Sequence, residues 1–489
     1  MTIPPEQQEV ALYLAELAGH EAKETHISAV FVGSDTVWKL KKAVRLPFLD
    51  FSTLQAREHF LRRELAINQP AAPGLYRDIA SISRRSDGML TLGGEPALDW
   101  VLRMARIPEG DFLDAIAARG ELSPSLLDGL GDAVARDQAL REPVAGWDSA
   151  ASLLRVTAGN AQSALAAGLP AAPVATWQQR TEAALHALRP WLTRRAASGF
   201  VRRCHGDLHL GNLCLWQGKP VAFDALEFDE AMATIDTGYD LAFLLMDLEH
   251  RVSRSAANRV MNRTLARSGD VEMARALPAF MSERAMVKAH ISAAMGNPTD
   301  AATYLEAAQA YLAPPPPLML AIGGLQGTGK STLARRLAPD LGRAPGAVVL
   351  RSDELRKRLF DRAPEDRLPQ EAYSETANQK VNATLVDLAL TAAEAGHAVI
   401  LDATFLDPSM RQAAEAAARK VRVPFLGVWL QAPLAELERR IESRRNDASD
   451  ATLAVLRRSA QSETLPADWL RVDAQDLDMA ANVVRGALL

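Results

Sequence analysis

Cysteine is almost absent from this sequence, since Cys204 and Cys214 are the only two among 489 residues. Two cysteines cannot build a disulfide framework or a four-thiolate zinc site, so the sequence favours a reducing compartment and implies no structural metal. Long apolar runs are also missing, because no stretch reaches the 18 or so residues that a membrane span needs. The first ten residues, MTIPPEQQEV, lack the basic flank and apolar region of a secretory signal. We therefore expect a cytoplasmic protein without a membrane partner.

An excess of charge of one sign is lacking as well. The chain has 55 basic and 60 acidic residues, a formal net charge of −5, and the segment from residue 318 onward has 23 of each. Neither part is therefore a basic module that would bind nucleic acid or an anionic surface through its overall field. With 48% hydrophobic and 24% charged residues, the composition is that of a folded chain of about three compact units.

Four consecutive prolines, residues 314–317, divide the sequence. Proline donates no backbone hydrogen bond and favours an extended segment, so we expect a linker over 313–317. Before it, strand-like segments at 27–32 and 36–40 and a helix from near Ser52 precede mostly helical sequence at 111–197 and 236–312. Beyond it, apolar strands at 318–322, 347–350, 398–401 and 425–430 alternate with alanine-rich helices. The pattern predicts an α+β bilobal domain over 1–312, with lobes of about 1–104 and 105–312, and an α/β domain with a parallel sheet over 318–489.

The clearest motif follows the first strand of the second domain. Residues 324–331 read GLQGTGKS and fit the phosphate-binding pattern G-x-x-x-x-G-K-[ST] between a strand and a helix. In this pattern the glycines let backbone N–H groups surround phosphates, the lysine reaches the β and γ oxygens, and the final hydroxyl ligates Mg²⁺. The expected nucleotide-binding residues are Gly324, Gly327, Thr328, Gly329, Lys330, Ser331 and Thr332.

Two aspartates follow other strands of this domain. Asp402 comes at the end of an apolar strand, where it can position a metal or water beside the phosphates or simply cap the next helix. Asp353 follows the strand at 347–350, and Arg356 comes three residues later. In a phosphoryl transferase, Asp353 can accept the proton of the acceptor hydroxyl while Arg356 holds charge, but a helix cap with a solvated arginine is the alternative.

Four arginines, Arg439, Arg440, Arg444 and Arg445, cluster on a helix predicted over 435–445. They can close over transferring phosphates as a lid, or they can form an ordinary solvated face.

A second motif lies in the first domain. Residues 205–212 read HGDLHLGN and fit H-x-D-x-x-x-x-N, the spacing of kinase catalytic loops. In such a loop Asp207 accepts a hydroxyl proton and Asn212 binds Mg²⁺. Asp224, after a short strand, is a second candidate metal ligand. We expect Lys39 to hold phosphate with Glu64 as its ion-pair partner, although each can instead be a solvated charge.

These motifs resemble two families. The run from Gly324 through SDELR at 352–356 to DATF at 402–405 and Arg444 resembles P-loop kinases of the zeta-toxin and polynucleotide-kinase-like group. That resemblance implies Asp353 as the base and Arg440 or Arg444 as lid arginines. The segments KLKK at 39–42, FLDFS at 48–52, HGD at 205–207 and FD at 223–224 resemble the aminoglycoside phosphotransferase family, which has a kinase-like fold.

Together these observations predict a bifunctional, Mg-ATP-dependent phosphotransferase. Each domain would transfer the γ-phosphate of ATP to a hydroxyl of a small, sugar-like metabolite. Two alternatives remain at this point: a P-loop domain that acts as an ATP-binding switch on one small-molecule kinase, or one that phosphorylates nucleic-acid 5′ ends. The even charge of the second domain does not favour nucleic acid as the partner.

Overall fold

The computed structural model describes residues 2–46, 49–443, 449–461 and 465–488. The chain forms two compact units, one of residues 1–152 and 189–247 and the other of residues 153–188 and 248–489. Within the described ranges, no helix is long and apolar enough to cross a membrane.

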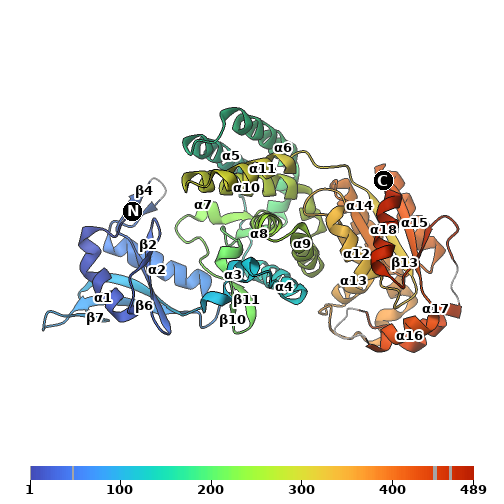
Figure 1. Ribbon diagram of the computed structural model, residues 1–489, viewed down its shortest axis with the longest axis horizontal. Helices are drawn as coiled ribbons and strands as arrows, with labels where there is room; N and C mark the ends of the chain where they lie inside the picture. Colours follow the sequence, from blue (N-terminus) through green and yellow to red (C-terminus); the bar gives the residue numbers. More distant parts are fainter. Residues whose placement is uncertain (1, 47–48, 444–448, 462–464, 489) are drawn as a thin grey trace. The chain divides into compact units, whose positions relative to one another are not determined.

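An antiparallel sheet of six strands opens the first unit (blue in Figure 1). Its order is β1 (Lys23–Glu24), β2 (Ser28–Val32), β3 (Thr36–Lys41), β8 (Ala97–Ala105), β6 (Tyr76–Arg84) and β7 (Leu90–Leu92). Side chains alternate between its two faces: Val101 packs in the cluster that contains Leu14 of α1 (Gln8–Ala18), and Leu102 packs with Leu61 of α2 (Leu54–Asn68). The sheet and α2 together hold the charged residues of the first site.

Helix α2 begins at Leu54, directly after the FLDFS segment and its cap residue Thr53. The hydroxyl of Thr53 accepts a hydrogen bond from the N–H of Ala56 at 3.1 Å and caps the helix. Ser52, near which the helix was predicted to begin, lies before the cap and donates its hydroxyl to Asp50 at 2.5 Å. The helix was predicted correctly, and it begins two residues later than Ser52.

Short paired strands complete the first unit around helices α3 (Leu113–Ala118) and α4 (Pro124–Leu140). Strand β9 (Val201–Arg203) pairs with β12 (Thr234–Asp236), and β10 (Leu213–Trp216) forms a hairpin with β11 (Lys219–Ala222). A buried ion pair, Arg195 with Asp236 at 2.6 Å, ties the end of α6 (Ala171–Ala197) to β12. The loops from β9 to β10 and from β11 to β12 carry the predicted catalytic and metal-binding residues.

The second unit begins with a layer of helices. Residues 153–188, from α5 (Ser149–Ala166) and α6, pack with α10 (Leu277–Ala294) and α11 (Pro298–Tyr311). Trp177 is fully buried and donates its indole N–H to Ser282 at 2.9 Å. Residues 314–317 then lie outside helices and strands.

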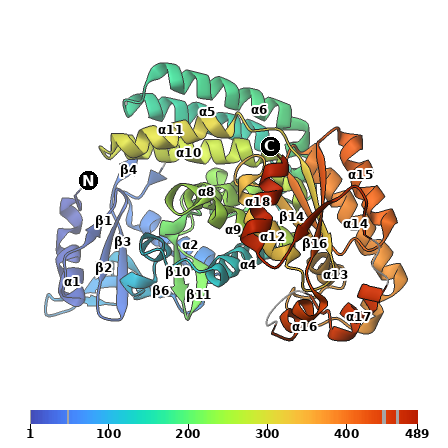
Figure 2. The ribbon, with the colours of Figure 1, turned by 45° about the vertical axis from the view of Figure 1, so that its right-hand side comes forward.

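A parallel sheet of five strands forms the rest of the second unit, as predicted. Its order is β14 (Val348–Arg351), β15 (Val399–Asp402), β13 (Met319–Gly324), β16 (Phe425–Gln431) and β17 (Leu470–Asp473). Figure 2 shows α12 (Lys330–Leu337) and α18 (Leu477–Leu488) on one side of the sheet, with α14 (Glu375–Glu394) and α15 (Pro408–Val421) on the other. The remaining helices of this sheet domain are α13 (Ser352–Leu359), α16 (Leu434–Ser443) and α17 (Leu453–Gln461). Strand β17 was not predicted from the sequence.

Helix α9 (Arg254–Ser268) covers the edge strand β14. The side chain of Asn262 accepts a hydrogen bond from the N–H of Val349 at 2.7 Å and donates to the carbonyl of Ala347 at 3.1 Å. Asn258 donates to the same carbonyl at 3.0 Å. Exposed backbone groups at a sheet edge are a template for unwanted pairing, and these two amides occupy them. Contacts of this kind explain why helices that precede the proline run belong to the same compact unit as the parallel sheet.

Candidate active sites

Lys39 is at the centre of the first site. It lies on β3 and contacts Glu64 of α2 at 2.7 Å and Asp224 at 2.5 Å. The Glu64 side chain is fully buried, and that of Lys39 is 13% exposed. Burial alone would raise the pKa of Glu64, but Lys39 and Lys41 outweigh it and lower the pKa to about 2. The structure thus places together the lysine and glutamate that were predicted as a pair.

A second buried pair, not predicted from the sequence, lies beside the first. Lys41 contacts the other carboxylate oxygen of Glu64 at 2.8 Å and also forms an ion pair with Glu227. Burial raises the pKa of Glu227, against the attraction of Lys41. The signal was present in the sequence, because Lys41 shares a strand face with Lys39 and an acidic residue comes three positions after Asp224.

Asp224 is held in an unusual backbone conformation after β11. Its φ angle is 60°, which non-glycine residues adopt infrequently. Its N–H donates to the hydroxyl of Tyr76 at 2.8 Å, and the next N–H, of Ala225, donates to Asn68 at 2.9 Å. These two bonds, from a strand and from α2, fix the turn that directs the Asp224 carboxylate toward Lys39.

The loop of residues 205–212 is fixed by bonds at both ends. Its first part is held by Asp240, which accepts the N–H of Gly206 at 2.9 Å, and its second part by Asp247, which accepts the N–H of Leu210 at 2.9 Å. The His205 ring contacts the carbonyl of Phe223 at 2.9 Å, which ties the loop to the segment before Asp224. The buried carboxylates of Asp240 and Asp247 therefore fix the shape of the loop.

Asp207 and Asn212 face each other across this loop. The amide nitrogen of Asn212 donates to the backbone carbonyl and to the carboxylate of Asp207, each at 2.9 Å. The Asp207 side chain remains 43% exposed. Both bonds use the amide nitrogen, which leaves the amide oxygen of Asn212 as the atom that can ligate a cation. Together with the Asp224 carboxylate it gives the oxygen-only donor set that Mg²⁺ prefers.

The second site is built on the loop between β13 and α12. Gly324, Gly327 and Gly329 have φ angles of 134°, 88° and 88°, in the region that glycine adopts at little cost. A Cβ at Gly324 would lie 2.5 Å from the carbonyl oxygen of Leu430. Lys330 turns back to contact the carbonyls of Gly324 and Leu325 at 3.0 and 2.8 Å. The Thr328 hydroxyl is buried and donates to Leu325, so that side chain braces the loop.

Ser331, Asp402 and Arg351 form a chain of contacts beside this loop. The Ser331 hydroxyl donates to Asp402 at 2.5 Å, and Arg351 contacts the same carboxylate oxygen at 3.2 Å. Arg351 also pairs with Glu354 at 2.7 Å. Asp402 is the last residue of β15, and α15 begins six residues later at Pro408, so Asp402 is not a helix cap. Arg351 was not predicted as a site residue, although it directly precedes the SDELR segment.

Asp353 and Arg356 lie in the first turns of α13, which rules out the cap interpretation for Asp353 as well. Burial raises the pKa of Asp353, and Arg351 opposes this increase. Arg356 donates to the carbonyl of Ala372 at 2.6 Å and lies over the ring of Tyr373, 4.9 Å from its centroid. A carboxylate with a raised pKa is a stronger base, which suits Asp353 to accept a proton from a hydroxyl.

Of the predicted lid arginines, Arg440 contacts the phosphate-binding loop. It pairs with Glu436 at 2.6 Å and donates to the carbonyls of Gly327 and Ala474, at 3.5 and 3.0 Å. Arg439 also pairs with Glu436 and is mostly exposed. Arg444 lies outside the described residues.

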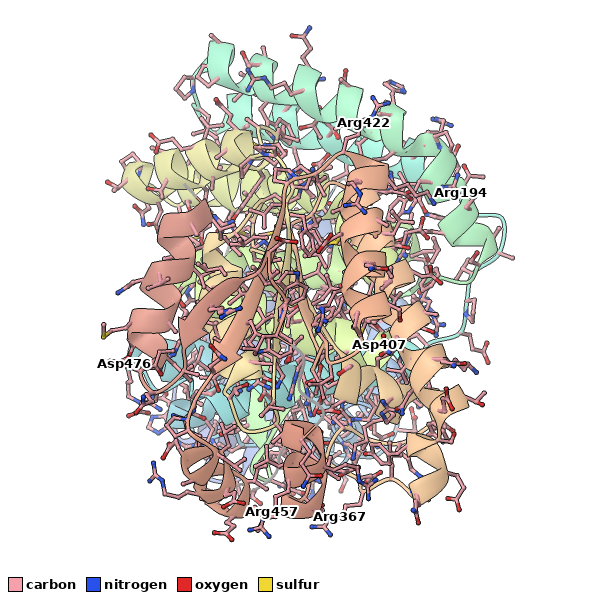
Figure 3. The ribbon with its side chains drawn as sticks, turned by 90° about the vertical axis from the view of Figure 1, so that its right-hand side faces the viewer. Arg194, Arg367, Asp407, Arg422, Arg457 and Asp476 are labelled. Carbon is pink, nitrogen blue, oxygen red and sulfur yellow. The ribbon has the colours of Figure 1, made fainter. Side chains whose placement is uncertain are left out.

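One cleft of about 850 Å³ connects these groups. Lys330, Ser331 and Thr332 line it on the phosphate side, and Asp353 and Arg356 line it farther along. Figure 3 shows Asp407 and Arg422 at opposite ends of α15, with Arg367 and Arg457 beyond the Asp407 end. The cleft lies at that end, where the carboxyl ends of the parallel strands meet, which is where ligands bind in such sheets.

The two sites correspond to two known families. Residues 36–277 match the model of the phosphotransferase enzyme family, and residues 319–466 match that of an AAA domain. This chain is a phosphotransferase with two kinase-type domains. An uncharacterized protein of Mycobacterium tuberculosis is 28% identical over 472 residues, which cover 92% of this chain and 90% of the relative. A protein of Mycobacterium bovis matches to the same extent.

Solved structures resemble one or the other half of this phosphotransferase. A GDP and kanamycin complex of an aminoglycoside phosphotransferase is 15% identical and covers 60% of this chain and 92% of its own, with a TM-score of 0.38. The APS kinase of Mycobacterium tuberculosis, in complex with AMPPNP and APS, is 23% identical and covers 36% and 98%, with a TM-score of 0.28. A gluconokinase from Sinorhizobium meliloti is 17% identical and covers 35% and 91%, with a TM-score of 0.27.

Proposed function

We propose that each domain transfers the γ-phosphate of ATP to a hydroxyl of a small, sugar-like metabolite, so that one chain has two phosphotransfer centres. The observation that supports this is the presence of two complete and separate sets of residues. One set has Lys39, Asp207 and Asp224, and the other has Lys330, Asp353 and Asp402. Each set combines a lysine for phosphate, a candidate base and a carboxylate for a metal.

In the first centre, Lys39 binds the phosphates of ATP and Glu64 holds the lysine in place. Asp207 accepts the proton of the acceptor hydroxyl. The acceptor oxygen bonds to the γ-phosphorus as the bond from that phosphorus to the bridging oxygen breaks, and ADP leaves. Asp224 and the amide oxygen of Asn212 would hold Mg²⁺, which supplies neutralisation of the phosphate charge when bound.

In the second centre, backbone N–H groups of the loop at 324–331 and the N-terminus of α12 surround the phosphates, and Lys330 neutralises the β and γ oxygens. Ser331 and Asp402 would hold Mg²⁺. Asp353 takes the proton from the acceptor, and Arg356 and Arg440, which both line the cleft, provide positive charge. The same bonds form and break as in the first centre.

The experiment is an incubation of the full chain with ATP and a metabolite pool, followed by mass spectrometry for phosphate additions. Wild type is compared with Asp207→Ala and Lys330→Ala. We expect each variant to lose a different set of phosphorylated products. If neither variant changes the products, both assignments are wrong.

A second candidate is favoured by the contact between α9 and β14. Helix α9 lies in the range that matches the phosphotransferase family, and β14 leads directly to Arg351 and Asp353. A nucleotide-dependent change at the P-loop could therefore act on the preceding domain without a second acceptor. This alternative predicts that Asp353→Ala leaves all acceptor-dependent ADP release intact, whereas the proposal predicts loss of one part of it. Labelled phosphate on an oligonucleotide would instead indicate nucleic-acid 5′ ends as the acceptor.

A further inference from the structure

The first two turns of α14 present a polar face to the cleft of the P-loop domain. Glu375, Asn378, Gln379 and Asn382 are spaced by three, one and three residues, so they lie on one side of the helix. All four line the cleft together with Asp353 and Arg356. None of these four residues was predicted as a site residue.

The polarity of this face is limited to the part beside the cleft. Asn378 and Asn382 continue at helical spacing into Leu385 and Ala389, which are fully buried against the sheet domain. The same stripe of α14 thus changes from amide to apolar side chains where the cleft ends. Asparagine is a weaker helix former than leucine or alanine, so stability of the helix does not account for two asparagines here.

The amides are placed to contact a ligand. The Asn378 nitrogen donates to the carbonyl of Tyr373 at 3.2 Å, which orients the side chain and leaves its oxygen as an acceptor. Asn378 and Asn382 are half-buried and line the cleft, so a ligand in the cleft can contact them. Amide side chains offer both donors and acceptors, which is what a hydroxyl needs because it donates one hydrogen bond and accepts others.

The charges that line the cleft bear on which ligands it can hold. Among the described residues, five basic side chains (Lys330, Arg351, Arg356, Arg440 and Arg458) and five acidic ones (Asp353, Glu375, Asp402, Asp407 and Asp450) line it, so it has no excess of positive charge. Arg356 already donates to Ala372 and lies on the ring of Tyr373. With the ATP phosphates already using Lys330, an acceptor with a carboxylate, phosphate or sulfate would find no surplus of positive charge here, whereas a neutral sugar needs none.

We propose that Glu375, Asn378, Gln379 and Asn382 bind the acceptor of the P-loop domain and select a neutral, hydroxyl-rich molecule such as a sugar or polyol. This inference rests on the proposed function of that domain. In this inference α14 recognises the acceptor, while the loop at 324–331 binds the nucleotide.

The test uses the full chain with Asp207→Ala, so that the first centre does not contribute. A panel of neutral aldoses and polyols is compared with sugar acids and sugar phosphates for ATP-dependent phosphorylation. Asn378→Ala and Asn382→Ala are then compared with Lys380→Ala, an exposed residue of the same helix that does not line the cleft. We expect neutral acceptors to be phosphorylated, and each asparagine variant to raise the acceptor KM by about three- to tenfold, as for a lost hydrogen bond. In the asparagine variants the KM for ATP should stay within about twofold of the wild-type value. In Lys380→Ala both the acceptor KM and the KM for ATP should stay within about twofold of wild type.

Three outcomes separate this inference from the function on which it rests. If phosphorylation depends on Lys330 but the asparagine variants leave the acceptor KM unchanged, the role of α14 is wrong and the kinase function stands. If only the charged acceptors are phosphorylated, the assignment of a neutral acceptor is wrong. If no acceptor of either class is phosphorylated in a Lys330-dependent manner, both the inference and the second kinase centre are rejected.

Discussion

At the scale of single residues, the first centre is a compensated cluster of buried charges. Two lysines, Lys39 and Lys41, alternate with two glutamates, Glu64 and Glu227, and Asp224 completes the set at the exposed end. One Glu64 oxygen contacts Lys39 and the other contacts Lys41. Removal of this carboxylate therefore leaves the two lysines close together, with Asp224 and Glu227 as their remaining carboxylate partners. Removal of one member of a buried ion pair commonly costs about 3–5 kcal/mol.

We therefore predict that Glu64→Gln lowers the free energy of unfolding of the first unit by about 3 kcal/mol and strongly reduces phosphoryl transfer at the first centre. The control is Glu58→Gln on the same helix, since Glu58 forms an exposed pair with Arg62 and should change stability by less than about 0.5 kcal/mol. Urea unfolding measures both. Equal effects of the two substitutions would contradict the importance of the buried cluster.

A second buried carboxylate, Glu283, lies in the helical layer of the other unit. It contacts the hydroxyl of Thr157 and accepts the amide of Asn160 at 3.0 Å. The Thr157 hydroxyl donates to Glu283 and also lies 3.0 Å from the carbonyl of Leu153. Burial raises the pKa of Glu283 to about 7, above its ordinary value of 4.5, although the hydrogen bonds from Thr157 and Asn160 act to lower it.

A raised carboxylate pKa gives a definite pH dependence. Between the ordinary value of 4.5 and about 7, the unfolded chain has lost this proton and the folded chain retains it, so the free energy of unfolding falls as pH rises. Glutamine mimics the protonated acid, and Glu283→Gln should abolish this loss. We predict that the variant is more stable than wild type by about 2–3 kcal/mol at pH 8 and similar to it at pH 4.5. Thermal unfolding across this pH range measures the difference, and a gap that does not change with pH would contradict the assignment.

At the scale of elements, α9 completes the edge of the parallel sheet. Strand β14 has a neighbour, β15, on one side only, and Asn258 and Asn262 supply the partners on the other. The C-terminal end of α9 adds Arg263 and Arg267, which pair with Glu365 in the segment after α13 at 2.7 and 3.3 Å. A helix from the phosphotransferase-family range thus stabilises the strand that positions Arg351 and Asp353.

We predict that Asn262→Ala lowers the free energy of unfolding of the second unit by about 1–3 kcal/mol, because it leaves the N–H of Val349 buried without its partner. Hydrogen exchange should accelerate at Val349. Asn482→Ala removes an exposed asparagine from α18 and serves as the control. An exchange rate at Val349 that is the same in wild type and in Asn262→Ala would show that α9 does not protect the strand.

Some features of the fold and of the sites could be predicted from the sequence, and others could not. The parallel sheet and the two motif loops follow from local patterns, namely apolar strands, glycine positions and the spacing of Asp207 and Asn212. The cap of α2 and the partners Arg351 and Glu227 depend on contacts between segments far apart or on the exact residue at which a helix begins. The polar face of α14 was missed because amides at helical spacing resemble an ordinary solvated face until the cleft beside them is known.

At the scale of the whole molecule, the chain is a phosphotransferase in which two nucleotide-binding architectures share one polypeptide. In our proposal, one would hold the nucleotide with side chains on an antiparallel sheet and a loop, and the other with backbone N–H groups at the start of a helix. The net charge of −5 gives no sign of either, because in our proposal each site would compensate phosphate charge locally. We therefore propose that both architectures bind nucleotide in the same chain.

The most direct measurement is the number of Mg-AMPPNP molecules bound per chain, determined by titration calorimetry of the full-length protein. We predict two sites in wild type, one in Lys330→Ala, one in Asp224→Ala, and none in the double variant. Circular dichroism of each variant establishes that it is folded. A single site in wild type, or loss of the same site in both single variants, would contradict the presence of two centres.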